Sequence, residues 1–188
     1  YNNNGVIIFS HPHNGVGFAS GKLRGRKETL RIESNYKGGN KHGDEKYLTE
    51  DGEIVLETQY DEGLKFGVES EYYDDGRVKS ITKYRGGVKV DTFKYFYNNG
   101  KLRELMPYVN GSRHGTTIIY NESGMVFREY EMVNGKKDGF FREYHSNGHI
   151  WEESIYKNGK RNGPYKRWSS DSNEPYQDGI YENGNKVD

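Results

Sequence analysis

The chain has 188 residues, and its 28 Lys and Arg balance its 28 Asp and Glu, so its formal net charge is zero. A balanced charge argues against a general nucleic-acid binder, and the absence of cysteine excludes disulfides, thiolate nucleophiles and cysteine-based zinc sites. Only 31% of the residues are hydrophobic, but 14% are aromatic and 17 are tyrosine, so we expect an ordered chain in which tyrosine supplies much of the buried surface. Long apolar runs are missing, so we do not expect a transmembrane protein.

Residues 1–35 contain extended runs at 5–10, 16–20 and 29–35, without the periodicity that follows. We expect these residues to form a divergent N-terminal β cap of one or two hairpins. A repeat sheet needs atypical terminal units because a bare sheet edge invites association.

Residues 36–179 repeat with a period of 24, which predicts six copies of one unit, the last of them degenerate, followed by a partial copy at 180–188. A tyrosine begins most copies, at Tyr36, Tyr60, Tyr84, Tyr108 and Tyr156. A glycine follows three residues later, at Gly63, Gly87, Gly111, Gly135 and Gly159 among others. No linker-like segment divides the chain, so we expect one continuous domain.

Each copy contains two short strand-like runs and two turns. The turns carry pairs such as Asn158-Gly159 and Asp51-Gly52, which are strong signals for tight hairpins. Glycine at such short intervals would break helices, so a helical solenoid is not expected. The predicted fold is all-β: an elongated, single, twisted antiparallel sheet, a meander of stacked 24-residue β-hairpins.

Residues 156–168 and 98–104 resemble bacterial MORN-type repeats, of the variant found in YwqK-family antitoxin-like proteins. The resemblance covers residues 36–168. It implies hairpin units stacked into a sheet, in proteins that include exported proteins, membrane-associated scaffolds and antitoxin-like proteins. It implies no catalytic motif.

One basic residue recurs two positions after each turn glycine. The column consists of Lys41, Lys65, Lys89, Arg113, Lys137 and Arg161. In a stack of hairpins these cations would line one basic edge, which could attract anionic lipid, another polyanion or an acidic protein. The alternative is a solvated charged rim that only protects the sheet edge.

Several aromatic residues fall outside the repeat columns, and they predict an aromatic interaction face. The candidates are Tyr73, Tyr95, Tyr97, Phe127, Phe141 and Trp151. Aromatic residues near arginine are typical of protein interfaces. The alternative is that they pair across neighbouring strands to cover a thin sheet.

His145 and His149 flank a turn near Glu143 and Glu152, but their positions match no catalytic or metal-binding motif. We therefore expect no catalytic, cofactor or metal site. The leading hypothesis is a non-enzymatic repeat scaffold that binds a protein partner through an extended aromatic and charged β face. The absence of Met at residue 1 and of cysteine, and the high polarity, suggest a bacterial protein that is exported or associated with the cell surface. The alternatives are a cytoplasmic antitoxin-like protein that binds a toxin, and a peripheral anionic-lipid binder that uses the basic edge.

Overall fold

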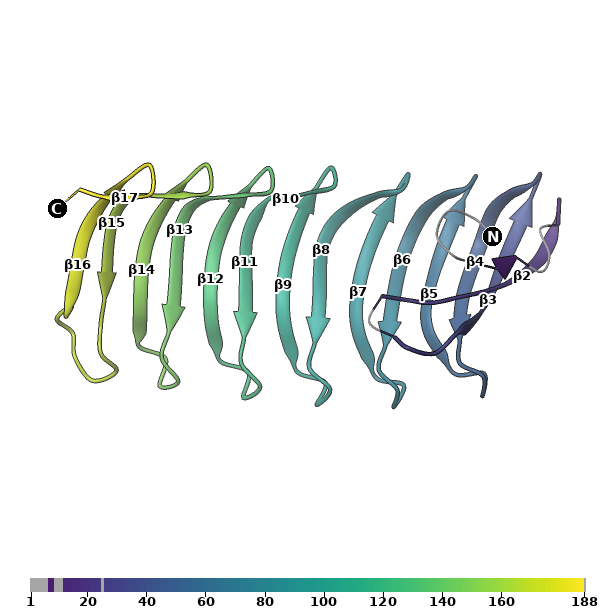
Figure 1. The fold of residues 1–188 in the computed structure, drawn as a ribbon, viewed down its shortest axis with the longest axis horizontal. Helices are drawn as coiled ribbons and strands as arrows, with labels where there is room; N and C mark the ends of the chain where they lie inside the picture. Colours follow the sequence, from purple (N-terminus) through teal and green to yellow (C-terminus); the bar gives the residue numbers. More distant parts are fainter. Residues whose placement is uncertain (1–6, 9–11, 25, 188) are drawn as a thin grey trace. The chain divides into compact units, whose positions relative to one another are not determined.

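The computed structural model describes residues 7–8, 12–24 and 26–187, and within these ranges the chain forms strands and turns without a helix (Figure 1). The described residues therefore include no helix that is long and apolar enough to cross a membrane. The chain divides into two compact units, Tyr1–Val90 and Asp91–Asp188, which are described here one at a time. In each unit successive strands pair antiparallel, so the predicted all-β meander is confirmed.

The first unit is a meander in which each strand pairs with the next one along the chain. Its strands are β1 (Ile7–Ile8), β2 (Gly15–Gly21), β3 (Leu30–Lys37), β4 (Asn40–Leu48), β5 (Ile54–Asp61), β6 (Leu64–Tyr72) and β7 (Val78–Arg85). The extended run expected at 5–10 lies mostly outside the described residues, and its described part is β1. The runs expected at 16–20 and 29–35 lie almost entirely in β2 and β3.

The strand β8 (Val88–Phe96) contains the division between the units, and its residues from Asp91 onward, which belong to the second unit, pair with β9. The remaining strands are β9 (Leu102–Val109), β10 (Ser112–Arg113), β11 (Gly115–Tyr120), β12 (Val126–Val133), β13 (Lys136–Tyr144), β14 (Ile150–Lys157), β15 (Lys160–Arg167), β16 (Gln177–Glu182) and β17 (Asn185–Lys186). From β11 to β17 each strand again pairs with its sequence neighbour.

The first hairpin turn of each copy has two successive residues in the left-handed backbone region, as two-residue type I′ turns require. At Asn158-Gly159 the φ angles are 52° and 87°, and at Asn134-Gly135 they are 48° and 82°. The glycine N–H also donates to the carbonyl of the basic residue in the preceding copy, from Gly63 to Lys41 over 2.8 Å and from Gly159 to Lys137 over 2.7 Å. The 24-residue period is therefore a period of hydrogen bonds between neighbouring copies.

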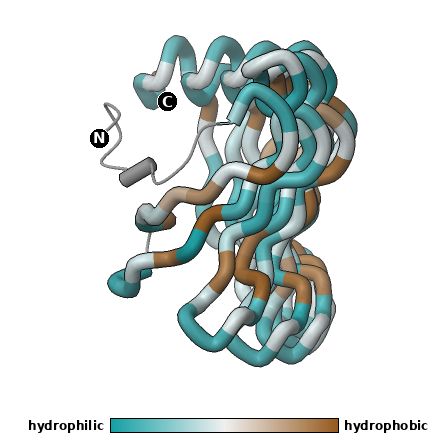
Figure 2. The backbone as a smooth tube through the Cα atoms, turned by 90° about the vertical axis from the view of Figure 1, so that its right-hand side faces the viewer, coloured by the Kyte–Doolittle hydropathy of each residue, from teal (hydrophilic) through white to brown (hydrophobic). Residues whose placement is uncertain are grey.

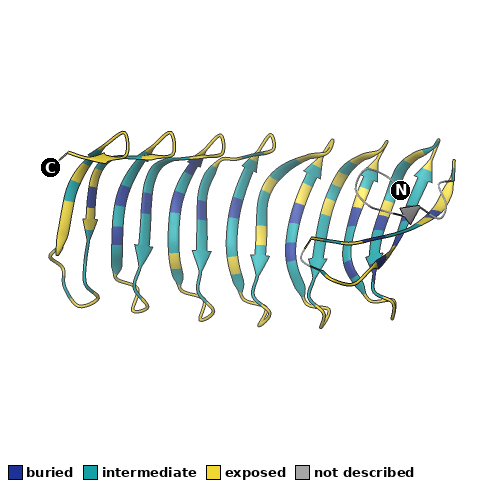
Figure 3. Ribbon diagram, in the orientation of Figure 1, coloured by how far each residue is buried: buried dark blue, intermediate teal, exposed yellow. Residues whose placement is uncertain are grey.

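The second turn of most copies contains an Asp-Gly or Asn-Gly pair. At Asn147-Gly148 the glycine N–H donates to the carbonyl of His145, and the N–H of His145 donates to the carbonyl of His149. A register shift accompanies this turn, between Glu143 and Tyr144 in this copy. Along the strands of each unit the hydrophobic residues lie between hydrophilic turns (Figure 2), and the buried residues lie within the strands (Figure 3).

Each unit buries few aliphatic side chains. In the second unit Tyr130, Met132 and Phe141 form the core cluster, and Ile119 and Tyr156 pack against it. In the first unit the most deeply buried apolar residues are Leu30, Ile32 and Val55. Buried polar residues accompany them, among them Thr58, Thr117, Glu45 and Glu152. Buried charges need partners, so the contacts of Glu45 and Glu152 define the candidate site.

Candidate functional site

One face of the sheet in each unit carries the basic column, and we call it the ladder face; the other side is the opposite face. The ladder face is defined by Lys41, Lys65, Lys89, Arg113, Lys137 and Arg161 and by the residues that alternate with them along the strands. Side chains two apart in a strand share a face, so a carboxylate four residues after a lysine lies on the same face. The cations therefore start at the turn edge, and their side chains have partners on the ladder face.

In the first unit two of these cations, Lys41 and Lys65, each pair with one carboxylate. Lys41 forms an ion pair with Glu45, whose side chain is 1% exposed, and its Nζ lies 4.9 Å from the centre of the Tyr60 ring. Glu45 also accepts hydrogen bonds from Ser34 at 2.6 Å and from the Tyr60 hydroxyl at 3.2 Å. The buried carboxylate is thus satisfied on three sides.

The next copy repeats this arrangement. Lys65 forms an ion pair with Glu69 and lies 5.0 Å from the centre of the Tyr84 ring. The Tyr84 hydroxyl donates to Glu69 at 3.3 Å. The copies of the first unit therefore share a structural triad of lysine, glutamate and tyrosine.

Three half-buried tyrosines beside carboxylates are held in the protonated form. Burial and the Glu45 carboxylate raise the pKa values of Tyr47 and Tyr60 well above the usual value for tyrosine. In the second unit, burial and a 2.6 Å hydrogen bond to Glu129 raise the pKa of Tyr144 to about 12. These hydroxyls act as donors to carboxylates across the pH range in which proteins normally work.

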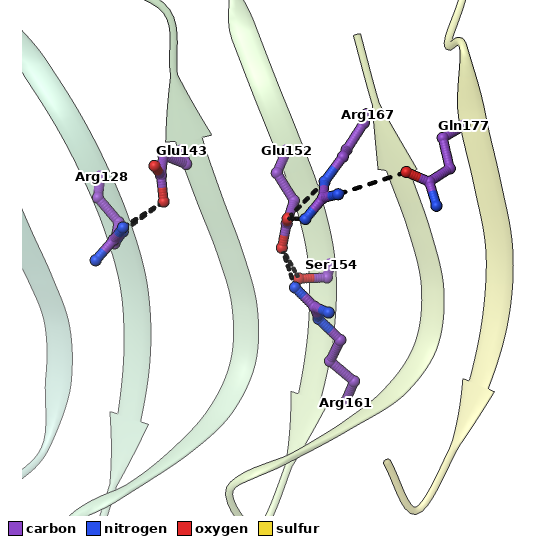
Figure 4. Close-up of polar contacts among 7 residues, drawn as sticks. All are labelled: Arg128, Glu143, Glu152, Ser154, Arg161, Arg167 and Gln177. Atoms are coloured by element: carbon purple, nitrogen blue, oxygen red, sulfur yellow. Dashed lines mark hydrogen bonds and ion pairs between the residues drawn. The ribbon is translucent and has the colours of Figure 1, made fainter. Parts of the chain in front are cut away.

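In the second unit one carboxylate serves two guanidinium groups (Figure 4). The Glu152 side chain is 3% exposed, and Arg167 donates to its Oε2 from Nε at 3.0 Å and from NH2 at 2.9 Å. Arg161 donates to the other oxygen, Oε1. Because one carboxylate faces two guanidinium groups, the cluster carries a net positive charge.

Arg128 and Lys137 continue this cluster on the neighbouring strands. Arg128 donates to Glu143 from Nε at 2.7 Å. Lys137 has no ion-pair partner among the described residues, and its Nζ lies 4.4 Å from the centre of the Phe141 ring. Burial, followed by the charges of Arg128 and Arg161, lowers the pKa of Lys137 below its usual value.

The other two cations of the predicted basic edge also have neighbours on the ladder face. The Nζ of Lys89 lies 6.0 Å from the centre of the Tyr84 ring. Arg113 pairs with Tyr108 in the sheet, and a hydrogen bond from its guanidinium to Tyr108 raises the pKa of Arg113. Apolar side chains are exposed beside the same turns, in the first unit at Leu64 and Val88 and in the second at Val109 and Val133.

The predicted aromatic face is divided by the structure. Phe141 is 6% exposed and belongs to the core, because its register across from Tyr130 and Ser154 places it on the ladder face. Phe127 is 39% exposed. Trp151 is half-buried, with the Arg167 guanidinium 4.8 Å from its ring centre.

The remaining aromatic candidates are also half-buried beside cations. Arg103 lies 5.2 Å from the ring centre of Tyr95 and 5.4 Å from that of Tyr97. The Nζ of Lys79 lies 6.0 Å from the ring centre of Tyr73. Cations over ring faces are favourable contacts, so these aromatic residues take part in the packing of the sheet.

A continuous exposed apolar stripe lies on the opposite face of β6 and was missed from the sequence. Leu64, Phe66 and Val68 are 54%, 50% and 46% exposed, and alternate residues of one strand point the same way. A groove of about 440 Å³ borders the stripe; it is lined by Asp44, Lys46, Glu57, Thr58, Gln59, Val68 and Ser70. The alternation of apolar residues in the sequence was the available signal.

The histidines near the turn at 145–149 do not form a metal site with the neighbouring acids. His145 Nε2 lies 2.8 Å from the carbonyl oxygen of Trp168. Over the described ranges, no group of three or more His, Cys, Asp or Glu side chains is arranged to hold a metal ion.

Comparison with known proteins agrees with the repeat geometry. Residues 92–110 and 137–158 match the family described as MORN repeat variant. Both matches lie in the second unit and include the second hairpin turn of a copy. A comparison with curated proteins found no match. These two segments are thus similar to MORN-type repeats, in agreement with the 24-residue period and the hairpin turns.

Proposed function

We propose that the protein is a non-enzymatic repeat scaffold that binds a protein partner through the opposite face of its sheet. MORN repeats are commonly protein- or lipid-binding modules. The observation that carries the proposal is the β6 stripe of Leu64, Phe66 and Val68, three consecutive outward side chains that are about half exposed. Monomeric proteins rarely leave contiguous apolar surface uncovered, and such surface marks interaction sites.

The side chains around the stripe fit a protein interface. Gln59 lies across from Phe66 on β5, and Lys83 lies across from Val68 on β7. Asp44, Lys46 and Glu57 add charges of both signs along the adjoining groove. An apolar centre with a polar rim is the usual composition of a protein interface.

The non-enzymatic part of the proposal is supported by how the buried carboxylates are used. The Glu45 carboxylate is paired with Lys41 and hydrogen-bonded by Ser34 and Tyr60. The Glu152 carboxylate is paired with two arginines. These carboxylates make contacts between side chains of neighbouring strands, and they are not placed opposite one another as a catalytic acid and base would be. The anionic-lipid alternative has less support in the first unit, because Lys41 and Lys65 are paired with glutamates and lie beside tyrosine rings on the ladder face. A bacterial origin and an exported or surface-associated location remain predictions.

The test uses the immobilised full chain and quantitative mass spectrometry, followed by binding of the purified partner that is recovered. The double variant Phe66→Ser and Val68→Ser is expected to weaken partner binding at least about tenfold, the loss typical of an interface centre. The control is Val109→Ser with Val133→Ser, which removes two exposed valines from the second unit. Equal binding by the β6 variant and the control, with both folded by circular dichroism, would reject the stripe as the interface.

A further inference from the structure

We propose that the ladder face of the second unit binds an extended acidic peptide segment through a band on β12 to β15 in which cations outnumber carboxylates. This face carries four cations, Arg128, Lys137, Arg161 and Arg167, and two carboxylates, Glu143 and Glu152, on these strands. Glu143 is paired with Arg128, and Glu152 is shared by both other arginines. The band therefore has a surplus of positive charge that the protein itself does not neutralise.

The corresponding strands of the first unit show that the surplus is specific to this place. On β4 and β6 the ladder-face cations Lys41 and Lys65 each have their own glutamate. Glu71 adds a further carboxylate there and pairs with Lys79. Lys41 and Lys65 thus each have a carboxylate of their own, whereas Lys137, at the equivalent position on β13, has no ion-pair partner among the described residues.

The four cations lie over aromatic rings in two groups, which meet where Tyr156 on β14 lies across from Arg161 on β15. The Lys137 ammonium lies near the rings of Phe141, Tyr130 and Tyr156, at 4.4, 4.9 and 5.0 Å from their centres. Arg128 contacts Phe141 at 5.6 Å. Arg161 and Arg167 lie over Tyr165 at 4.9 and 5.2 Å.

The arginines have exposed surface that an outside carboxylate can reach. The side chains of Arg161, Arg167 and Arg128 are 28–33% exposed. Guanidinium groups bind carboxylates through short, charge-assisted hydrogen bonds, and the adjacent rings can pack on the side-chain stems of a bound peptide.

The length of the band favours a peptide over a compact anion. From β12 to β15 there are three strand spacings of about 4.8 Å, so the band spans roughly 14 Å. An extended peptide rises about 3.3 Å per residue, so four to five residues bridge it and alternate side chains face it. A single phosphate group is too small to reach more than one or two of these cations.

The test measures fluorescence anisotropy of a labelled peptide of alternating Glu and Ala against the full chain, at low and at physiological ionic strength. We expect saturable binding that weakens with salt, and no binding of the matching Gln–Ala peptide. Lys137→Met should weaken binding about tenfold, the effect of removing one charged contact.

The matched control is Lys166→Met. Lys166 is exposed on the opposite face of β15, so this variant removes the same charge from the same unit and should bind like the unaltered protein. Lys137 has no carboxylate to leave unpaired, so its variant should keep the melting temperature. Equal peptide binding by the two variants overturns the proposal, as does the absence of binding to the unaltered chain. The proposal is also overturned if the unaltered chain does not bind the peptide but sediments with phosphatidylserine vesicles, and if Lys137→Met abolishes that sedimentation. This result would assign the band to lipid binding.

Discussion

Glu152 shows how much a single buried residue contributes to the ladder face. Its carboxylate lies between Arg161 and Arg167, and removal of one partner from a buried ion pair typically costs about 3–5 kcal/mol. We expect Glu152→Gln to lower the free energy of unfolding by about 3 kcal/mol, measured by urea denaturation. Glu153→Gln is the control, because Glu153 lies on the opposite face and its side chain is 35% exposed. Similar losses for the two variants would contradict the assigned role.

Glu62 is the residue at which the turn chemistry is least favourable. It has a φ of 47°, where the equivalent Asn158 has 52° and a side chain that tolerates this region. We expect Glu62→Asn to raise the free energy of unfolding by about 1 kcal/mol, and Asn158→Glu to lower it by a similar amount. Thermal unfolding of both variants checks this, and a change of the same sign in both would refute the explanation.

At the scale of the strand, register decides which aromatic residue is structural. Phe141 on β13 lies in the core, whereas Phe127 on β12 is 39% exposed. We expect Phe141→Ala to cost about 3–5 kcal/mol of unfolding free energy, and Phe127→Ala to cost less than about 1 kcal/mol. Chemical denaturation of the two variants measures this difference, and comparable midpoints would show that the core lies elsewhere.

The hairpins could be predicted from the sequence because their turn chemistry is local. An Asn-Gly pair such as Asn158-Gly159 favours a tight hairpin turn whatever the rest of the sequence is. The candidate site could not be predicted in the same way, because the face of each side chain depends on register shifts such as that between Glu143 and Tyr144. Phe140 and Phe141 are adjacent residues of the same type, and they differ only in the face of the sheet on which they lie.

The same limit applies to the basic column. The period identified Lys41 and Lys137 as equivalent, but it did not reveal that Lys41 pairs with a glutamate while Lys137 lies among three rings. The spacing of Lys41 and Glu45 could have indicated the first pair, because residues four apart in a strand share a face.

At the scale of the whole molecule, the tyrosines with raised pKa values should make the protein less stable at alkaline pH. A tyrosine whose pKa is raised in the folded state contributes stability below its unfolded value of about 10, and that stability is lost as pH rises through the folded value. For Tyr144 the folded pKa is about 12, and Tyr47 and Tyr60 are shifted in the same direction. The lowered pKa of Lys137 has the opposite effect on stability as pH rises, but Lys137 is one group and the shifted tyrosines are several.

We therefore expect the urea midpoint to fall between about pH 10 and about pH 12, with a slope that Tyr144→Phe reduces. Urea titrations at several pH values in this range give the slope directly. A midpoint that stays constant to about pH 12, or the same slope in the variant, would show that these hydroxyls are not the groups responsible.

The backbone hydrogen bond from a turn glycine to the copy before it, as from Gly159 to Lys137, has an evolutionary consequence. Loss or duplication of a whole copy inside one unit places each of these backbone donors opposite an equivalent acceptor and keeps every side chain on its own face. Loss of half a copy exchanges the two kinds of turn and breaks that match. Recombination that changes the number of whole copies therefore preserves the backbone hydrogen bonds between copies, whereas an insertion of another length preserves them only where the chain loops out of the sheet.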